Sequence, residues 1–138
     1  MESKELILIY GLPASKEEGD KVQTVLRDEG ISFREVLPQE LGLEVGVLAG
    51  LDNADSCPPM VEPFSQCAMV FCGFSEQRLR DTLSLLREAG AGNNSLKAIL
   101  TPNNRDWRFC DLLEELQKER QELARIMKAK AEVEKKAT

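Results

Sequence analysis

The amino-acid sequence predicts an α/β domain built on a four-stranded, mostly parallel sheet. Two short runs, 6–10 (LILIY) and 67–71 (CAMVF), are apolar without alternation, which is typical of strands buried on both faces. Each run is soon followed by a glycine, an amphipathic helical pattern and a second strand pattern. Strand and helix therefore alternate along the chain, which favours a sheet with helices packed on both faces.

The first 37 residues form a strand–helix–strand unit in this interpretation. Ser15, with Glu18 three residues later, predicts a capping box at the start of a helix. That helix is expected to run to about residue 29 and to end at Gly30. The run 31–37 (ISFREVL) alternates in part, as an edge strand with one wetter face would.

A second unit of the same kind follows the apolar run at 67–71. Ser75 predicts the N-cap of a helix with one apolar face, and Gly90 predicts its end. The run 96–100 (LKAIL) predicts a short strand, and 101–104 (TPNN) predicts a loop, since proline ends strand pairing.

The last helix is expected to begin near Asn104 or Asp106 and to carry a row of apolar residues toward the core. Trp107, the single tryptophan, is predicted to be mostly buried against its first turns and to anchor the preceding loop. Extended to Lys135, this helix would be about 45 Å long, more than a domain of this size is wide.

These elements predict a strand order. The fully apolar strands, 5–10 and 67–72, should be central, and 31–37 and 96–100 should be the edges. This favours order 2-1-3-4, a flavodoxin-like three-layer α/β arrangement; a ferredoxin-like α+β fold of order 4-1-3-2 is the alternative. The choice depends on 38–64, since a crossover helix there would make the sheet parallel and a plain loop would make it antiparallel. Residues 40–51 are compatible with a short helix.

The runs GFSEQRLRDTLSLLREAG, LKAILTPNNRDW and LLEELQKER carry a resemblance to a known family. Over about 66–120 the chain resembles a small bacterial family known only as a domain of unknown function. The resemblance supports the elements of this part of the chain and implies no activity. No internal repeat is expected in the sequence.

Composition and charge exclude several classes of function. The net charge is −6 and the pI about 4.8, which disfavours binding to a phosphate backbone, so no nucleic acid is expected as partner. No apolar run is long enough to span a membrane and no signal peptide is evident, so we expect a cytoplasmic protein. The chain has no histidine, and its four cysteines lack metal-ligand spacing. We therefore expect no metal, no cofactor and no catalytic residues; an enzyme is not favoured.

The preferred hypothesis is a non-catalytic interaction or regulatory module. Residues 1–118 are expected to form one domain and 119–138 an extension of the last helix. That extension carries an apolar patch, so we expect a homodimer or docking on another protein. The patch consists of Leu123, Ile126, Met127 and Val133.

The alternative hypothesis is a binder of small anionic ligands. In a parallel sheet, the loops 11–15, 73–75 and 101–105 would share the carboxyl edge, and each precedes a helix whose backbone N–H groups favour anions. The side chains expected at such a site are Ser15, Ser75, Asn103, Asn104 and Arg105.

Overall fold

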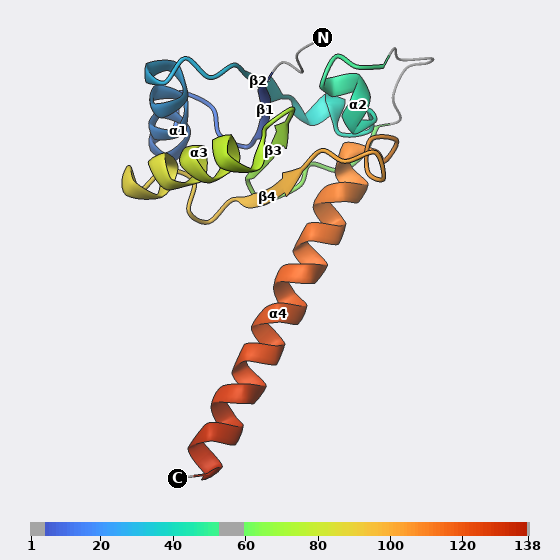
Figure 1. Ribbon diagram of the computed structural model, residues 1–138. Coiled ribbons are helices and arrows are strands. Elements are labelled where there is room, and N and C mark those ends of the chain that lie inside the picture. The colour runs from blue at the N-terminus through green and yellow to red at the C-terminus, as the bar shows by residue number, and fades with distance from the viewer. Residues whose placement is uncertain (1–4, 53–59, 138) are drawn as a thin grey trace.

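The computed structural model describes residues 5–52 and 60–137, with side chains up to residue 131. Four strands and four α-helices alternate along the chain (Figure 1). In order they are β1 (Leu6–Tyr10), α1 (Glu17–Asp28), β2 (Phe33–Val36), a short 3-10 turn (Pro38–Glu40), α2 (Val45–Leu48), β3 (Ala68–Cys72), α3 (Glu76–Glu88), β4 (Leu96–Ile99) and α4 (Phe109–Ala137).

The sheet has the order β2-β1-β3-β4, so the predicted order 2-1-3-4 is confirmed and the ferredoxin-like order is wrong. β1 pairs parallel with β2, and β3 pairs parallel with β4. The central pair, β1 with β3, is antiparallel, with Leu6 opposite Cys72 and Tyr10 opposite Ala68. The sheet is therefore mixed and mostly parallel, and it departs from a flavodoxin-like sheet at its centre.

The direction of β3 follows from the segment between β2 and β3. The one α-helix in its described residues, α2, has four residues and is about 6 Å long, too short to carry the chain back across the sheet. The chain therefore enters β3 at the same end of the strands at which it left β2, so β3 runs in the opposite direction to β2.

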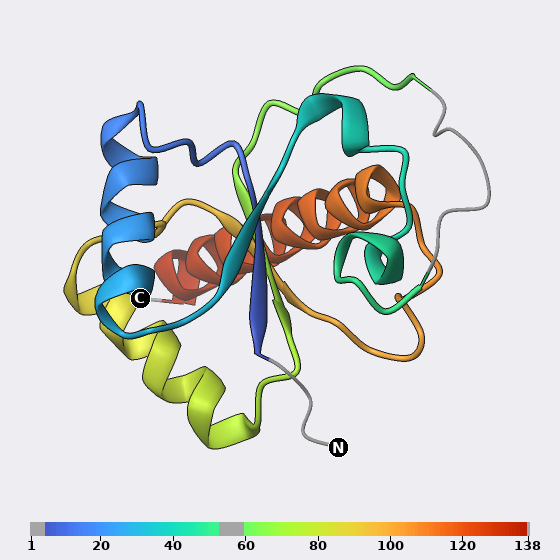
Figure 2. The same cartoon turned by 90° about the horizontal axis from the view of Figure 1, so that it is seen from above.

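Two apolar clusters fill the two faces of the sheet. Helices α1 and α3 cover one face, and α2 with the first turns of α4 covers the other (Figure 2). Successive residues of a strand point to opposite faces. In β3, Met69 and Phe71 accordingly join the α1–α3 side, whereas Val70 and Cys72 join the α2–α4 side. Cys67 packs on the α1–α3 side, so the thiols of Cys67 and Cys72 lie on opposite faces of the sheet.

The two strand–helix–strand units are built alike, although no internal repeat was expected. Gly11 and Gly73 follow β1 and β3 with φ of 72° and 74°. Gly30 and Gly90 close α1 and α3 with φ of 68° and 65°. The backbone hydrogen bonds after the two helices also correspond: Gly30 N–H donates to Arg27 and Gly90 N–H to Arg87. The strand order 2-1-3-4 with an antiparallel central pair has approximate two-fold symmetry. A half-turn about an axis between β1 and β3 exchanges β1 with β3 and β2 with β4.

Helix α1 does not begin as predicted. Its N-cap is Lys16, whose side chain makes no cap hydrogen bond, and Ser15 lies outside the helix. The Glu18 carboxylate instead accepts a hydrogen bond from the backbone N–H of Gly92, in the loop before β4. The predicted capping box is therefore wrong, because Glu18 is used to join the two halves rather than to cap its own helix.

Candidate functional site

Helix α4 is the element around which the candidate site is built. Phe109, Leu112 and Leu113 are buried in the core, and Leu116 packs against it while partly exposed. The spacing of three and four residues places these side chains on one helical face, as an amphipathic helix requires. The helix is thus held to the sheet by its first two turns.

The start of α4 is fixed by backbone pairing with the segment before α2. Val45 N–H donates to the Trp107 carbonyl at 2.9 Å, and Phe109 N–H donates to the Leu43 carbonyl at 2.8 Å. The helix begins at Phe109, later than the predicted Asn104 or Asp106. Trp107 is only partly buried, packed at the margin of the α2–α4 core cluster.

Next to this junction, Arg105 forms a two-pronged ion pair with Asp52. Its Nη2 lies 2.7 Å from Oδ1 and its Nε 2.8 Å from Oδ2. The Arg105 hydrogen bonds hold the pKa of the Asp52 carboxyl below its ordinary value, and the same pair raises the pKa of Arg105. Gly46 permits this arrangement, because a Cβ there would overlap the Asp52 carboxylate and come within 2.8 Å of Arg105 Cγ.

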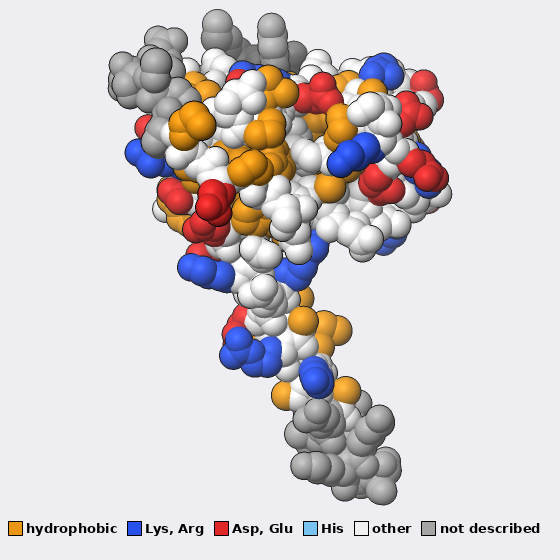
Figure 3. All heavy atoms as spheres, turned by 180° about the vertical axis from the view of Figure 1, so that it is seen from behind, with side chains coloured by type: hydrophobic (Ala, Val, Ile, Leu, Met, Phe, Trp, Pro, Cys, Tyr) orange, Lys and Arg blue, Asp and Glu red, His pale blue; other side chains and the backbone are white. Residues whose placement is uncertain are grey.

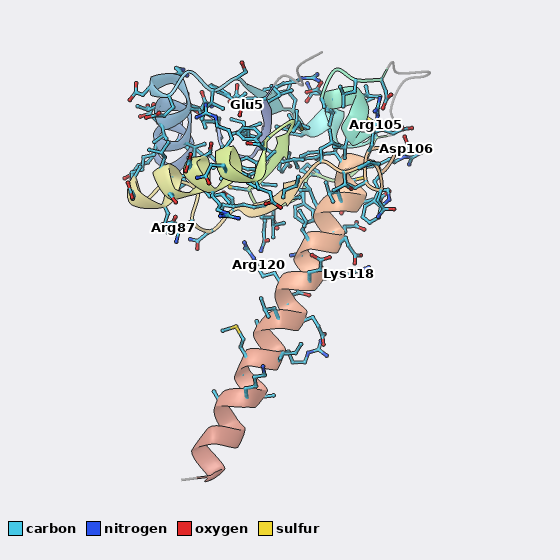
Figure 4. The ribbon with its side chains drawn as sticks, in the orientation of Figure 1. Glu5, Arg87, Arg105, Asp106, Lys118 and Arg120 are labelled. Atoms are coloured by element: carbon cyan, nitrogen blue, oxygen red, sulfur yellow. The ribbon has the colours of Figure 1, made fainter. Side chains whose placement is uncertain are left out.

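A second cationic contact lies further along α4. Arg120 points from α4 toward the loop before β4 (Figure 4), where its Nη1 donates to the Asn94 carbonyl at 3.0 Å and its Nη2 to the Ser95 carbonyl at 2.9 Å. Lys97 Nζ donates to the Gly92 carbonyl at 2.9 Å. Burial lowers the pKa of Lys97, and the nearby charge of Arg120 lowers it further.

The outer half of α4 is exposed and partly apolar. From Lys118 to Ala131 every side chain is exposed. Leu123, Ile126 and Met127 are 58%, 44% and 62% exposed, and apolar side chains lie along one side of the projecting helix among basic ones (Figure 3). Val133, the fourth residue of the predicted patch, belongs to the helix, but its side chain lies outside the part that the structure describes.

The residues predicted to bind an anion are divided between the two ends of the sheet. Because β1 and β3 run antiparallel, Ser15 lies beyond the strand ends on one side of the sheet. Ser75 and the 101–105 loop lie beyond the strand ends on the opposite side. Ser75 caps α3, its Oγ accepting from Arg78 N–H at 3.2 Å. Asn104 accepts from Thr101 N–H and donates to the Ile99 carbonyl, so it closes its own loop. Asn103 is exposed in the same loop.

A surface hollow next to the 101–105 loop is also unsuited to an anion. It has a volume of about 530 Å³ and lies beside the root of α4. Its lining carries more carboxylates than cations, which repels negative ligands. The lining residues are Asp106, Trp107, Arg108, Asp111, Glu114, Glu115 and Lys118.

The described thiols are free and one of them is deeply buried. Burial raises the pKa of Cys72 to about 11, which leaves it protonated and unreactive at neutral pH. Cys57 lies outside the described residues. Within residues 5–52 and 60–131, no three or more histidine, cysteine, aspartate or glutamate side chains are grouped to hold a metal ion. In that part of the chain, no helix has the length and apolar character that crossing a membrane requires.

Sequence reasoning did not anticipate that the segments before α2 and α4 pair with each other. Glu44 and Arg108 form an antiparallel bridge there, flanked by the hydrogen bonds of Val45 and Phe109. The pairing uses backbone groups alone, so side-chain patterns carry almost no signal for it. It matters because it fixes the direction in which α4 leaves the domain.

Comparison with known proteins finds a family match within the second half of the chain. No curated protein and no solved structure matches the sequence. Residues 68–123 match the model of a domain of unknown function, DUF3783, which confirms the resemblance expected over about 66–120. This match runs from β3 through the first half of α4, so it includes Leu123.

Proposed function

We propose that this chain is a non-catalytic interaction module whose binding surface is the outer half of α4. The observation that carries the proposal is the exposure of three large apolar side chains, Leu123, Ile126 and Met127, within five residues of a helix that has already left the core. An apolar stripe of this kind, bordered by charged residues, is typical of a surface that docks on another protein.

The energetics of the helix support a docking role. From Lys118 to Ala131 the side chains of α4 are exposed, and a stretch of helix without packing is only marginally stable in water. A partner that covers the stripe would bury apolar surface and stabilise the helix at the same time. This corresponds to helix-in-groove recognition, in which residues three and four apart serve as anchors.

The core does not require this stripe. Among residues 109–131, the buried side chains of α4 end at Leu113, and Leu116 is the last that packs against the core cluster. Replacing Leu123, Ile126 and Met127 should therefore change the free energy of unfolding by less than about 0.5 kcal/mol, as for other exposed positions. Binding can thus be tested without disturbing the fold.

The test compares the full chain with the variant Leu123→Gln, Ile126→Gln and Met127→Gln, since glutamine preserves helix propensity. Both are used to isolate binding proteins from an extract of the source cells. A matched control, Arg125→Gln with Lys128→Gln, changes the opposite face of the helix. We expect a protein retained by the original chain and the control and lost by the triple variant. Equal retention by all three proteins would contradict the proposal.

A further inference from the structure

Five residues of α4 follow the spacing of a coiled-coil seam. Leu116, Glu119, Leu123, Ile126 and Lys130 are separated by three, four, three and four residues, which places them in one row along the helix. Leu116 packs against the domain, and the next four side chains are exposed. The exposed row therefore has two apolar residues at its centre, a carboxylate at one end and an ammonium group at the other.

The charges of α4 are divided in the same way over residues 109–131. Residues 109–119 hold four carboxylates and one lysine, a net charge of −3. Residues 120–131 hold four cations and one glutamate, a net charge of +3. This division makes one half of the helix electrostatically complementary to the other half of an identical helix that runs in the opposite direction.

We propose that the stripe on α4 binds a second copy of this chain, helix against helix and antiparallel, about a two-fold axis between Ala124 and Arg125. In that register Leu123 of each copy packs on Ile126 of the other. Glu119 of each copy then lies beside Lys130 of the other, so every dimer contains two such ion pairs. This inference rests on the proposed function and names its partner.

A parallel pair is disfavoured by charge. In parallel register Glu119 would meet Glu119 and Lys130 would meet Lys130, and like charges in direct contact are unfavourable. In the antiparallel pair the two domains lie at opposite ends.

The interface is small. The contact from residue 119 to residue 130 spans about 17 Å of helix, and it buries less than the ~1,600 Å² of a standard interface. We therefore expect reversible association, to be measured by sedimentation equilibrium of the full purified chain from about 10 µM to about 1 mM.

Charge reversal tests the orientation. Glu119→Lys or Lys130→Glu converts two attractive contacts in each antiparallel dimer into two repulsive ones, so each should weaken dimerisation about tenfold. The double variant Glu119→Lys with Lys130→Glu should return to within about threefold of the original chain. Lys128→Glu makes the same change of charge as Lys130→Glu on the opposite face of the helix and should have little effect. Thermal unfolding of each variant checks that the fold is kept.

Two outcomes would overturn the inference: a chain that stays monomeric throughout this range, or single variants that dimerise as well as the original. Neither outcome contradicts the proposed function if the original chain still retains a protein from the extract that the triple glutamine variant does not retain. In that case the stripe serves a different protein. If that protein is absent as well, the proposed function fails together with the inference.

Discussion

The two halves of this molecule share a plan and differ in how they end. Each half is a strand, a helix on the α1–α3 face and a parallel strand, followed by a helix on the other face. In the first half that final helix is α2, with 4 residues, and in the second it is α4, with 29 residues. Val45 and Phe109, the first residues of these two helices, are both completely buried.

The difference identifies the part of α4 that the fold does not need. The part of α4 up to Leu116 does what α2 does, which is to cover one face of the sheet. The following turns have no counterpart among the described residues of the first half. The helix continues for more than 20 residues beyond Leu116, which supports a role in recognition.

The largest effect is expected where α4 enters the core. Phe109→Ala should lower the free energy of unfolding by about 4 kcal/mol, because it leaves a cavity under a completely buried ring. The corresponding change in the first half, Val45→Ala, removes less volume and should cost about 2 kcal/mol. Urea unfolding followed by circular dichroism measures both. Equal costs would mean that the two helix starts do not hold corresponding places in the core.

A second contrast lies between two glycines of α1, one within the helix and one just after its end. Helix α1 contains Gly19, where a Cβ would overlap the backbone of Leu12 and Pro13. Gly19→Ala should therefore destabilise the protein by about 3 kcal/mol, despite the better helix propensity of alanine. Gly30→Ala meets no neighbouring atom but must adopt φ near 68°, so it should cost about 1 kcal/mol. If the order of the two were reversed, the close approach of α1 to the loop after β1 would be refuted.

The two helix starts provide a smaller test. Ser75→Ala removes the hydrogen bond that caps α3 and should cost about 1 kcal/mol. Ser15→Ala should leave the stability within about 0.3 kcal/mol, because Ser15 is exposed and does not cap α1. Thermal unfolding of both variants measures the two effects. A loss of stability for Ser15→Ala as large as for Ser75→Ala would indicate that Ser15 does cap α1.

The smallest effect concerns the ion pair at the junction of α2 and α4. Because the pKa of Asp52 is lowered in the folded state, its contribution to stability is present above the ordinary aspartate pKa of about 3.9. It is lost as the pH falls through the lower folded value. Asp52→Asn should therefore reduce the loss of stability in that acid range, compared with the original chain. Unfolding curves at pH 5 and below, recorded for both proteins, test this; identical acid profiles would contradict it.

Much of the fold followed from sequence patterns because those patterns reflect burial. The runs at 6–10 and 67–71 identified the central strands, and Gly30 and Gly90 marked the helix ends. Strand direction could not be predicted in this way, since an apolar run looks the same in both directions. The similarity of the two halves has only a faint trace, TVLRDEG at 24–30 against SLLREAG at 84–90.

Sequence patterns predicted one part of the candidate site and missed another. The spacing of Leu123, Ile126 and Met127 predicted an apolar patch, and their exposure is confirmed. The anion site was derived from a parallel sheet, and the antiparallel centre separates its loops. The partners of Arg105 and Arg120 lie at positions 52 and 94–95, and such long-range contacts leave no pattern in a single sequence.

The contacts of Arg120 provide a point about which the outer part of α4 could tilt. Arg120 joins the helix to the 94–95 carbonyls, and Ala137 lies about 26 Å further along the axis. A tilt of about 10° at Arg120 would move that end by about 4 Å, whereas the core residues on the other side of the pivot would move much less. A small rearrangement of the loop before β4 would thus be enlarged at the far end of α4, where it would displace the proposed binding surface.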